Sequence, residues 1–420
     1  MDKGGLAGLT GAMKRDADVI VVGGGLNGPA LALALARAGL GVIVIDAQPA
    51  QARAEAAFDG RAYALAIASK RLLQAVGVWD RIAGGIQPIL QIKASDGRPG
   101  EGPAPFFLQF DAAEIEEGPM GFMVEDGALY AALLAAMAET DGLTHIPGAE
   151  VVAQEVTETG ASVTLKDGRV LTGALIAGCD GRRSGVAERA GIKRMGWDYG
   201  QTALVCAVEH DLPHDGTAHQ FFMPSGPLAI LPLTGNRSSI VWSERTETAA
   251  AIAALDDAEF LEVLRPRFGD FLGPIRLAGG RFRYPLNLTL AERYADRRIA
   301  LVGDAAHGVH PIAGQGLNLG FRDVGALAEV LVDAKRRGED IGAGDVLARY
   351  QDWRRFDATT LALGMDGVNR LFSNDNPVLR GARDLGMGVV GALPGLRRAF
   401  IRQAAGIAGT PPKLLRGLAL

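Results

Sequence analysis

The carboxylate of Asp304 and a glycine-rich loop lie close together in the segment from Arg298 to Asp323. The apolar run from Ile299 to Val302 predicts a buried strand, and Asp304 follows it at a sharp turn. A carboxylate in that place suits the hydroxyls of a sugar-like ligand. Further along, the loop leads into a predicted helix near Gly316, whose first backbone N–H groups favour a negative charge. The two features together predict a site for one polar, partly anionic ligand.

The N-terminal region contains a matching half-site. The apolar run from Val19 to Val22 predicts a buried parallel strand. Three glycines follow it with the spacing G-x-G-x-x-G. The first permits a tight turn, the second lets a pyrophosphate approach the backbone, and the third lets helix and strand pack closely. The residues expected to hold a dinucleotide here are Gly23, Gly25, Leu26, Asn27 and Gly28.

The residues after the glycines strengthen this interpretation. A helix is expected from Ala30 to Ala38, ending at Gly39, and a second strand from Val42 to Ile45. That strand ends in Asp46, about 20 residues after the glycines, where an acid binds the ribose of a dinucleotide. Glycine-rich turns also occur without ligands, but two half-sites in one chain favour a bound cofactor over that structural explanation.

Composition limits the classes of protein that fit. The chain has 420 residues, of which 48% are hydrophobic and 22% charged, as in a soluble globular protein with room for two domains. Cys179 and Cys206 form no disulfide or zinc pattern, so a reducing, cytoplasmic setting is expected. The net charge of −5 argues against nucleic acid. No apolar segment is long enough to predict a transmembrane helix.

The order of predicted elements indicates an α/β fold with α+β character. The segment from Arg61 to about Val76 is expected to be a helix, and residues 200–245 are expected to form an antiparallel sheet. A Rossmann-like domain made of discontinuous segments is thus interrupted by a β-rich domain, with the ligand at the seam between them. The expected divisions are residues 17–80, 120–185 and 283–345 for the Rossmann-like domain, 81–119 and 186–282 for the β-rich substrate domain, and 346–420 for a helical C-terminal region.

A third motif, from Leu175 to Ser184, is another apolar strand that ends in Asp180-Gly181. At these three motifs the sequence resembles the flavin-dependent aromatic hydroxylases, the class that includes para-hydroxybenzoate hydroxylase. Finer features resemble the branch that acts in ubiquinone biosynthesis, and the resemblance covers residues 17–415. The branch-like segments are Asp59–Leu65, Tyr199–Gln201, Gly226–Pro232, Ser239–Trp242 and His310–Asp323. One departure is Ala187, where the class often has an arginine that bears on pyridine-nucleotide binding.

The resemblance implies FAD as cofactor and assigns roles to individual residues. The glycines would hold the pyrophosphate, Asp46 the adenosine ribose and Asp304 the ribityl chain. Arg61 would reach the phosphates, although a solvated arginine at a helix start is the plainer explanation. Val124 would meet the adenine through its backbone. The loop residues expected beside the isoalloxazine ring are Gly314, Gln315, Gly316, Leu317 and Asn318.

The same resemblance implies a monooxygenase reaction. Reduced flavin is negatively charged near N1, and N–H groups at a helix start stabilise that charge. Dioxygen, the co-substrate, forms a flavin C4a-hydroperoxide that an electron-rich phenol attacks. Pro311, Gly314 and Gly316 are expected to form the flavin-face loop that serves catalysis, and no acid–base residue is assigned. His307 and His310 lack partner acids at metal-like spacing, so no metal site is expected.

The implied substrate is a polyprenylated phenol bound over the antiparallel sheet. The candidate wall residues, each of which also fits ordinary core packing, are Phe221, Phe222, Pro227, Leu231, Pro232 and Trp242. The four expected to contact the substrate are Phe221, Leu231, Pro232 and Trp242. No second dinucleotide motif is present, so NAD(P)H or a separate reductase is left open as electron donor. The alternatives are hydroxylation of a soluble aromatic acid, a flavin reductase or dehydrogenase acting on an isoprenoid, and a non-catalytic flavoprotein subunit of a quinone-synthesis complex.

The C-terminus is basic and apolar. From Leu379 to Leu420 it contains seven bases and one acid. By its charge alone such a segment fits a helical layer packed on the core at least as well as peripheral contact with an anionic membrane. The polyprenylated substrate implied by the resemblance would be delivered from a membrane, and this favours peripheral contact, at the inner face for a cytoplasmic protein. The charged residues concerned are Arg380, Arg383, Asp384, Arg397, Arg398, Arg402, Lys413 and Arg416.

Overall fold

The structure is a computed structural model that describes residues 15–49, 58–100, 102–311, 314–373, 386 and 393–420. Its central sheet has six strands, all parallel except β19 at one edge. In order across the sheet they are β19 (Ala295–Asp296), β20 (Ile299–Leu301), β12 (Leu175–Gly178), β1 (Val19–Val22), β2 (Val42–Asp46) and β8 (Leu143–Pro147). The parallel strands of the two predicted half-sites therefore lie in one sheet.

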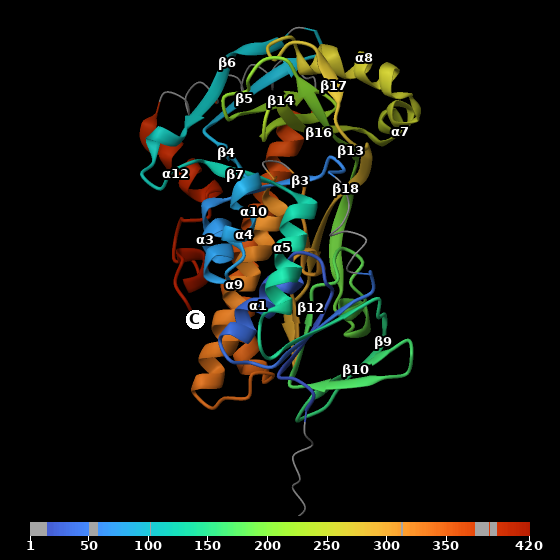
Figure 1. Cartoon of the computed structure of the whole chain (residues 1–420), viewed down its shortest axis with the longest axis vertical. Helices are drawn as coiled ribbons and strands as arrows, with labels where there is room; N and C mark the ends of the chain where they lie inside the picture. Colours follow the sequence, from blue (N-terminus) through green and yellow to red (C-terminus); the bar gives the residue numbers. More distant parts are fainter. Residues whose placement is uncertain (1–14, 50–57, 101, 312–313, 374–385, 387–392) are drawn as a thin grey trace, which may run out of the picture.

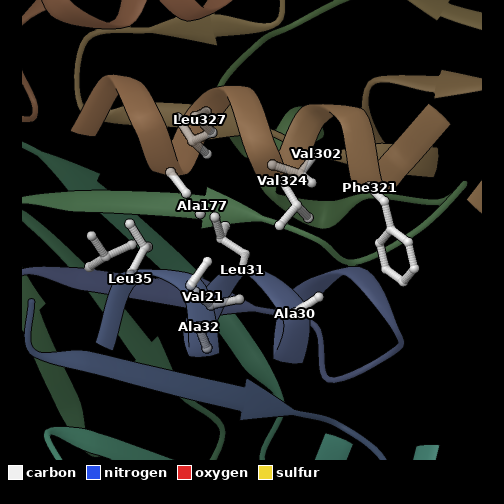
Figure 2. Packing of buried hydrophobic residues seen from close by; sticks show 14 of the residues in the cluster. Val21, Ala30, Leu31, Ala32, Leu35, Ala177, Val302, Phe321, Val324 and Leu327 are labelled. Carbon is white, nitrogen blue, oxygen red and sulfur yellow. The ribbon is translucent and has the colours of Figure 1, made fainter. Parts of the chain in front are cut away.

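Helices cover this sheet and complete its core (Figure 1). They are α1 (Asn27–Arg37), α5 (Asp126–Ala138), α9 (Gln315–Arg336) and α10 (Gly344–Phe372). Helix α1 is apolar almost all round, as expected of a helix buried on every side. Figure 2 shows Leu31 and Leu35 of α1 in one buried cluster with Val21 of β1, Ala177 of β12 and Val324 of α9.

The second large sheet has nine strands and is antiparallel except where β14 pairs with β5. This confirms the antiparallel sheet expected over residues 200–245 and extends it. Its strands are β5 (Gln91–Arg98), β6 (Gly102–Asp111), β13 (Arg194–His210), β14 (Thr217–Met223), β15 (Gly226–Leu233), β16 (Arg237–Arg245), β17 (Ile275–Leu277), β18 (Phe282–Ala291) and β21 (His307–Gly308). Helices α7 (Thr246–Ala254) and α8 (Asp257–Phe268) cover part of it.

The helix expected from Arg61 to Val76 is wrong in its first part. Residues Ala62–Leu65 form strand β3, and helix α3 begins only at Ile67 and runs to Ala75. Strand β3 pairs antiparallel with β7 (Gly121–Glu125), which also pairs with β4 (Gln87–Ile89). Alanine and leucine favour helix locally, but the distant partner strand overrides that preference.

Two further regions complete the fold. A three-stranded sheet contains β9 (Val151–Val156), β10 (Ala161–Leu165) and β11 (Val170–Gly173). The C-terminal helical region continues beyond α10 with α12 (Pro394–Ala404) and a 3-10 turn, η5 (Lys413–Arg416). Arg380, Arg383 and Asp384 of the basic segment lie outside the described residues.

Candidate active site

The first half-site is a turn between β1 and α1 whose glycines have different reasons to be glycine. Gly23 has a positive φ of 111°, and a Cβ there would lie 2.3 Å from the carbonyl oxygen of Cys179. A Cβ on Gly28 would lie 1.9 Å from the carbonyl oxygen of Gly23. Gly24, for which no role was predicted, abuts Asp46: a Cβ on Gly24 would lie 2.3 Å from the carboxylate. Close packing therefore requires these three glycines.

Gly25 is different, because a Cβ there would meet no protein atom within 4 Å. It lines a cleft of about 880 Å³ at the carboxyl ends of β1, β2 and β12. Ligands of parallel α/β sheets bind at that end of the strands. Asp46, Asp180 and Arg61 line the same cleft. A glycine that packing does not require, facing a cleft with an acid at the second strand end, fits the pyrophosphate and ribose of a dinucleotide.

Arg61 lies at this cleft in front of β3, not at a helix start. Its Nε donates to Asp59 at 2.8 Å, and its Nη2 lies 3.3 Å from the carboxylate of Asp126, which is buried. The guanidinium also lies over the ring of Phe282. The hydrogen bond with Asp59 is the main cause that raises the pKa of Arg61. The sequence did not predict this pairing, which holds a fixed positive charge beside the cleft.

The second half-site begins where β20 ends, in the 3-10 turn η3 (Gly303–Ala305). Gly303 has a positive φ of 62°, and Asp304 follows it. The carboxylate of Asp304 accepts a hydrogen bond from Nε of Arg182 at 3.2 Å, and both side chains are half-exposed. Sequence reasoning missed Arg182, although it directly follows the Asp180-Gly181 motif.

A buried carboxylate, Asp323 of α9, lies behind this turn. It accepts hydrogen bonds from the backbone N–H of Gly303 at 2.9 Å, Nε2 of His307 at 2.5 Å and Nε of Arg354 at 2.7 Å. Burial opposes ionisation, but His307 and Arg354 hold the pKa of Asp323 below its ordinary value. Asp323 closes the motif that the sequence singled out, yet nothing in the sequence identified these partners.

The loop before α9 places a helix start next to β3, where a Cβ on Gly314 would lie 3.0 Å from the Cβ of Ala64. Gly314 caps α9 with a left-handed φ of 62°, and its N–H donates to the carbonyl of Pro311 at 3.0 Å. Ile312 and Ala313 lie outside the described residues. A Cβ on Gly316 would meet nothing within 4 Å. The first turn of α9, which contains Gln315 and Leu317, has backbone N–H groups without intrahelical acceptors, so it suits an anionic ligand.

Asn318 has a role that the sequence did not reveal. Its Oδ1 accepts from the N–H of Ala66 at 2.8 Å and from Oγ of Ser69 at 2.6 Å. Its Nδ2 donates to the carbonyls of Ala64 at 2.8 Å and Gly314 at 3.0 Å. The side chain therefore joins β3 and α3 to the loop, and this network positions Gly314.

Val124 lies apart from the cleft. It is buried within β7, where its register partner is Tyr63. The valine that lines the cleft is Val151, the first residue of β9. The adenine contact expected of Val124 therefore has a better-placed candidate in Val151.

The four predicted substrate residues do not gather at one place. Phe221 and Trp242 lie in the cluster beneath α7 and α8 with Phe260. Leu231 packs on a different cluster, which contains Met123 and Leu233. Pro232 is buried in the sheet, where its register partner is Ser238. Because side chains alternate across a strand, neighbouring residues face opposite sides of the sheet. Phe222, the neighbour of Phe221, contacts Phe372 of α10, with ring centroids 4.2 Å apart.

His310 is buried directly before Pro311 and the loop that leads to α9. Its ring lies edge-on to Tyr199 at 5.2 Å, and neither ring nitrogen has a hydrogen-bond partner among the described residues. Burial first, and the charge of Arg182 second, lower the pKa of His310 to about 4, so the ring is neutral near pH 7. Within the described part of the chain, no cluster of three or more His, Cys, Asp or Glu side chains is arranged to hold a metal.

Comparison with known proteins adds a family and relatives. The family described as FAD binding domain matches residues 16–361. Ubiquinone hydroxylase UbiL of Rhodospirillum rubrum is 46% identical over 415 residues, covering 98% of this chain and 95% of the relative. The 3-demethoxyubiquinol 3-hydroxylase of Escherichia coli is 36% identical and covers 93% and 98%. Crystalline p-nitrophenol 4-monooxygenase PnpA of Pseudomonas putida shares the fold, with a TM-score of 0.78, 20% identity and coverage of 94% and 99%.

Proposed function

The chain belongs to the FAD binding domain family, and from that membership we propose that it hydroxylates the aromatic ring of a polyprenylated phenol in ubiquinone biosynthesis. One observation carries the proposal. Two half-sites from distant parts of the chain meet at the carboxyl ends of one sheet, in a chain that matches a ubiquinone hydroxylase over nearly its whole length. The enzyme class is an FAD-dependent aromatic-ring monooxygenase.

In this proposal each half-site holds one end of FAD. Gly25 and Asp46 hold the pyrophosphate and the adenosine ribose, and Asp304 binds the ribityl chain. When bound, FAD supplies the electrons and the oxygen activation that aromatic hydroxylation requires. The first turn of α9 stabilises negative charge on the ring through fixed N–H groups, which need no reorganisation during the reaction. Pro311 and Gly314 hold the loop in place.

The test is hydroxylation of a defined substrate. Purified protein loaded with FAD is given a demethoxyubiquinol analogue with a short prenyl tail, dioxygen and reductant, and the product is identified by mass and fragmentation. We expect one added oxygen, and the fragment pattern names the ring carbon. Turnover of a water-soluble phenolic acid without turnover of the prenylated phenol would favour the soluble-substrate alternative. Oxygen consumption without a hydroxylated product would favour a reductase or oxidase.

The electron donor is a separate part of the proposal. We propose that NAD(P)H reduces the bound flavin directly. In the class of hydroxylases that the sequence resembles, NAD(P)H reaches the flavin without a dinucleotide fold of its own, so the lack of a second dinucleotide motif in the sequence does not argue against this donor. Anaerobic mixing with NADH and with NADPH, followed by flavin absorbance, tests it. Bleaching by one nucleotide supports direct reduction. Flavin that stays oxidised with both, yet is reduced by an added protein reductase, supports a separate donor.

Contact with a membrane is proposed for one face of α12. Among the described residues, no helix is both long and apolar enough to cross a bilayer. Two bases of α12 are already paired, Arg397 with Glu114 at 3.0 Å and Arg402 with Glu117 at 2.8 Å. Phe400 and Leu393 are each about half exposed. Leu393 and Phe400 are seven residues apart and share one side of this helix, while the exposed Arg398 on another side adds a base, a combination suited to an anionic membrane.

Vesicle flotation tests this surface. The protein should float with vesicles that contain anionic lipid, and the double variant L393S/F400S should remain in the soluble fraction. Removing a paired base, as in Arg402→Gln, should have a smaller effect. Absence of vesicle binding, together with loss of co-purification with other ubiquinone-synthesis proteins in the double variant, would assign the surface to a quinone-synthesis complex instead.

A further inference from the structure

We propose that Asp323 is a positioning residue for the cofactor, which fixes the turn that presents Asp304 to the ribityl chain. This inference rests on the proposed function, because it concerns the same FAD site. Asp323 is fully buried in α9, and both of its carboxylate oxygens are bonded to protein donors. Its influence on the cofactor is therefore indirect and acts through the backbone of η3.

The hydrogen bonds of Asp323 enclose the turn. One carboxylate oxygen, Oδ2, accepts both from the N–H of Gly303 and from Nε2 of His307. These two residues flank Asp304 on either side along the chain. Within the turn, the N–H of Ala306 donates to the carbonyl of Gly303 at 2.8 Å. The place of Asp304 is thus set by a single oxygen atom behind it.

The turn also contacts the first half-site. A Cβ on Gly303 would lie 2.2 Å from Nδ2 of Asn27, at the start of α1. A Cβ on Gly320 of α9 would lie 2.5 Å from the same atom. The Asn27 side chain therefore fits between η3 and α9 without spare room. Any shift of η3 relative to α9 changes the distance between the two ends of the cofactor site.

A second limb of the network keeps Asp323 charged. Arg354 of α10 is 3% exposed, donates from Nε to Asp323 Oδ1 at 2.7 Å, and donates from Nη1 to Asp357 at 2.5 Å. A buried carboxylate needs such a partner, because an uncompensated charge is strongly destabilising. With both oxygens engaged, Asp323 has little freedom to rotate away from Gly303.

The competing explanation is that Asp323 only stabilises the core. The other end of the same strand offers a matched comparison. Arg298 precedes β20, is 1% exposed, and pairs with Asp340 at 2.5 Å and with the carbonyl of Ala174 at 3.0 Å. That pair also anchors β20, but it lies at the end of the strand away from η3. A general loss of strand stability should follow from disrupting either pair.

The experiment compares Asp323→Asn with Asp340→Asn by titrating each folded protein with FAD and with ADP. ADP contains the part of FAD that the first half-site would hold, and it lacks the ribityl chain. An Asn at 323 has no negative charge and only one acceptor oxygen, so its NH2 group must face either Arg354 or the donors of Gly303 and His307, and either arrangement loosens the turn. We expect FAD to bind roughly 10- to 100-fold more weakly to Asp323→Asn, with ADP affinity unchanged. Asp340→Asn should change neither affinity, although both variants melt at lower temperature.

The outcomes separate the inference from the proposed function. Equal weakening of FAD and ADP, or an FAD dissociation constant for Asp323→Asn within about twofold of wild type, overturns the positioning role. Wild-type protein that binds no FAD overturns the proposed function itself. A merely unstable variant lowers the number of binding sites per protein and leaves the dissociation constant unchanged.

A second variant keeps the test open if Asp323→Asn does not fold. His307→Gln leaves Asp323 paired with Arg354 and with Gly303, but it loosens the far side of the turn. We expect a several-fold loss of FAD affinity, again without change for ADP. If this variant binds FAD with unchanged affinity and at full stoichiometry, the hydrogen bond between His307 and Asp323 does not hold the turn in place for the cofactor.

Discussion

The two half-sites proposed for the cofactor are built on different physical principles. The first comes from one contiguous segment, β1–turn–α1–β2, and its constraints are close contacts at Gly23 and Gly28 with backbone atoms and at Gly24 with the side chain of Asp46. The second depends on side chains from distant segments, above all Asp323 behind the turn and Asn318 in the loop. The first should therefore respond to added volume, and the second to changed charge or hydrogen bonding.

The largest effect is expected where packing leaves no room. In Gly28→Ala the new methyl group would lie 1.9 Å from a backbone oxygen, which cannot move aside without shifting β1. We expect the free energy of unfolding to fall by about 3 kcal/mol or more and FAD binding to be lost. Urea unfolding and flavin absorbance after reconstitution measure the two effects.

Gly25→Ala is the matched control, because its methyl group meets no protein atom within 4 Å. Its unfolding free energy should stay within about 0.5 kcal/mol of wild type, while FAD binds at least tenfold more weakly. If Gly25→Ala binds FAD normally, the cofactor does not approach the backbone at this glycine.

The next effect tests the second half-site at its carboxylate. Asp304→Ala removes a half-exposed side chain whose one protein partner among the described hydrogen bonds is Arg182. The fold should survive, with a melting temperature close to that of wild type. FAD should bind roughly 100-fold more weakly, because a charge-assisted contact to the ribityl hydroxyls is lost. Retained yellow protein with native flavin absorbance contradicts this assignment.

The contrast between the half-sites also explains what the sequence could predict. The strand, glycines, helix and acid of the first half-site were placed correctly, because each depends on residues a few positions away. The same holds for β20, the turn at Asp304 and the start of α9. Helix α3 began later than expected, since pairing of Ala62–Leu65 with β7 depends on residues about 60 positions distant.

The sequence did not reveal the hydrogen bonds between polar side chains that are far apart along the chain. No local pattern connects Asp323 to Arg354, Asn318 to Ser69, or Asp304 to Arg182. The substrate walls were uncertain for a related reason. Alternation along a strand shows that Phe221 and Phe222 face opposite ways, but only the packing of α7, α8 and α10 shows which face each one meets.

An intermediate effect concerns the titration of His310. Its folded-state pKa of about 4 lies below the ordinary 6.5, so the fold favours the neutral ring. That contribution is fully present above pH 6.5 and is lost as the pH falls toward 4, because the unfolded chain takes up the proton first. Between pH 7 and pH 5, wild type should lose about 2 kcal/mol more unfolding free energy than His310→Gln. Urea unfolding at both pH values measures this difference. If wild type and His310→Gln lose the same unfolding free energy between the two pH values, His310 does not cause the pH dependence.

The smallest effect is expected for the ion pair that joins the two motifs, Arg182 with Asp304. Both side chains are between one third and two fifths exposed, so solvent screens their attraction, and such pairs contribute about 0–1 kcal/mol. Arg182→Gln should therefore lower the unfolding free energy by less than about 1 kcal/mol, and the difference should shrink between 0.05 M and about 0.5 M salt. A loss of FAD as large as that of Asp304→Ala would make Arg182 a cofactor ligand in its own right. The second half-site would then depend on an exposed cation as much as on its buried carboxylate.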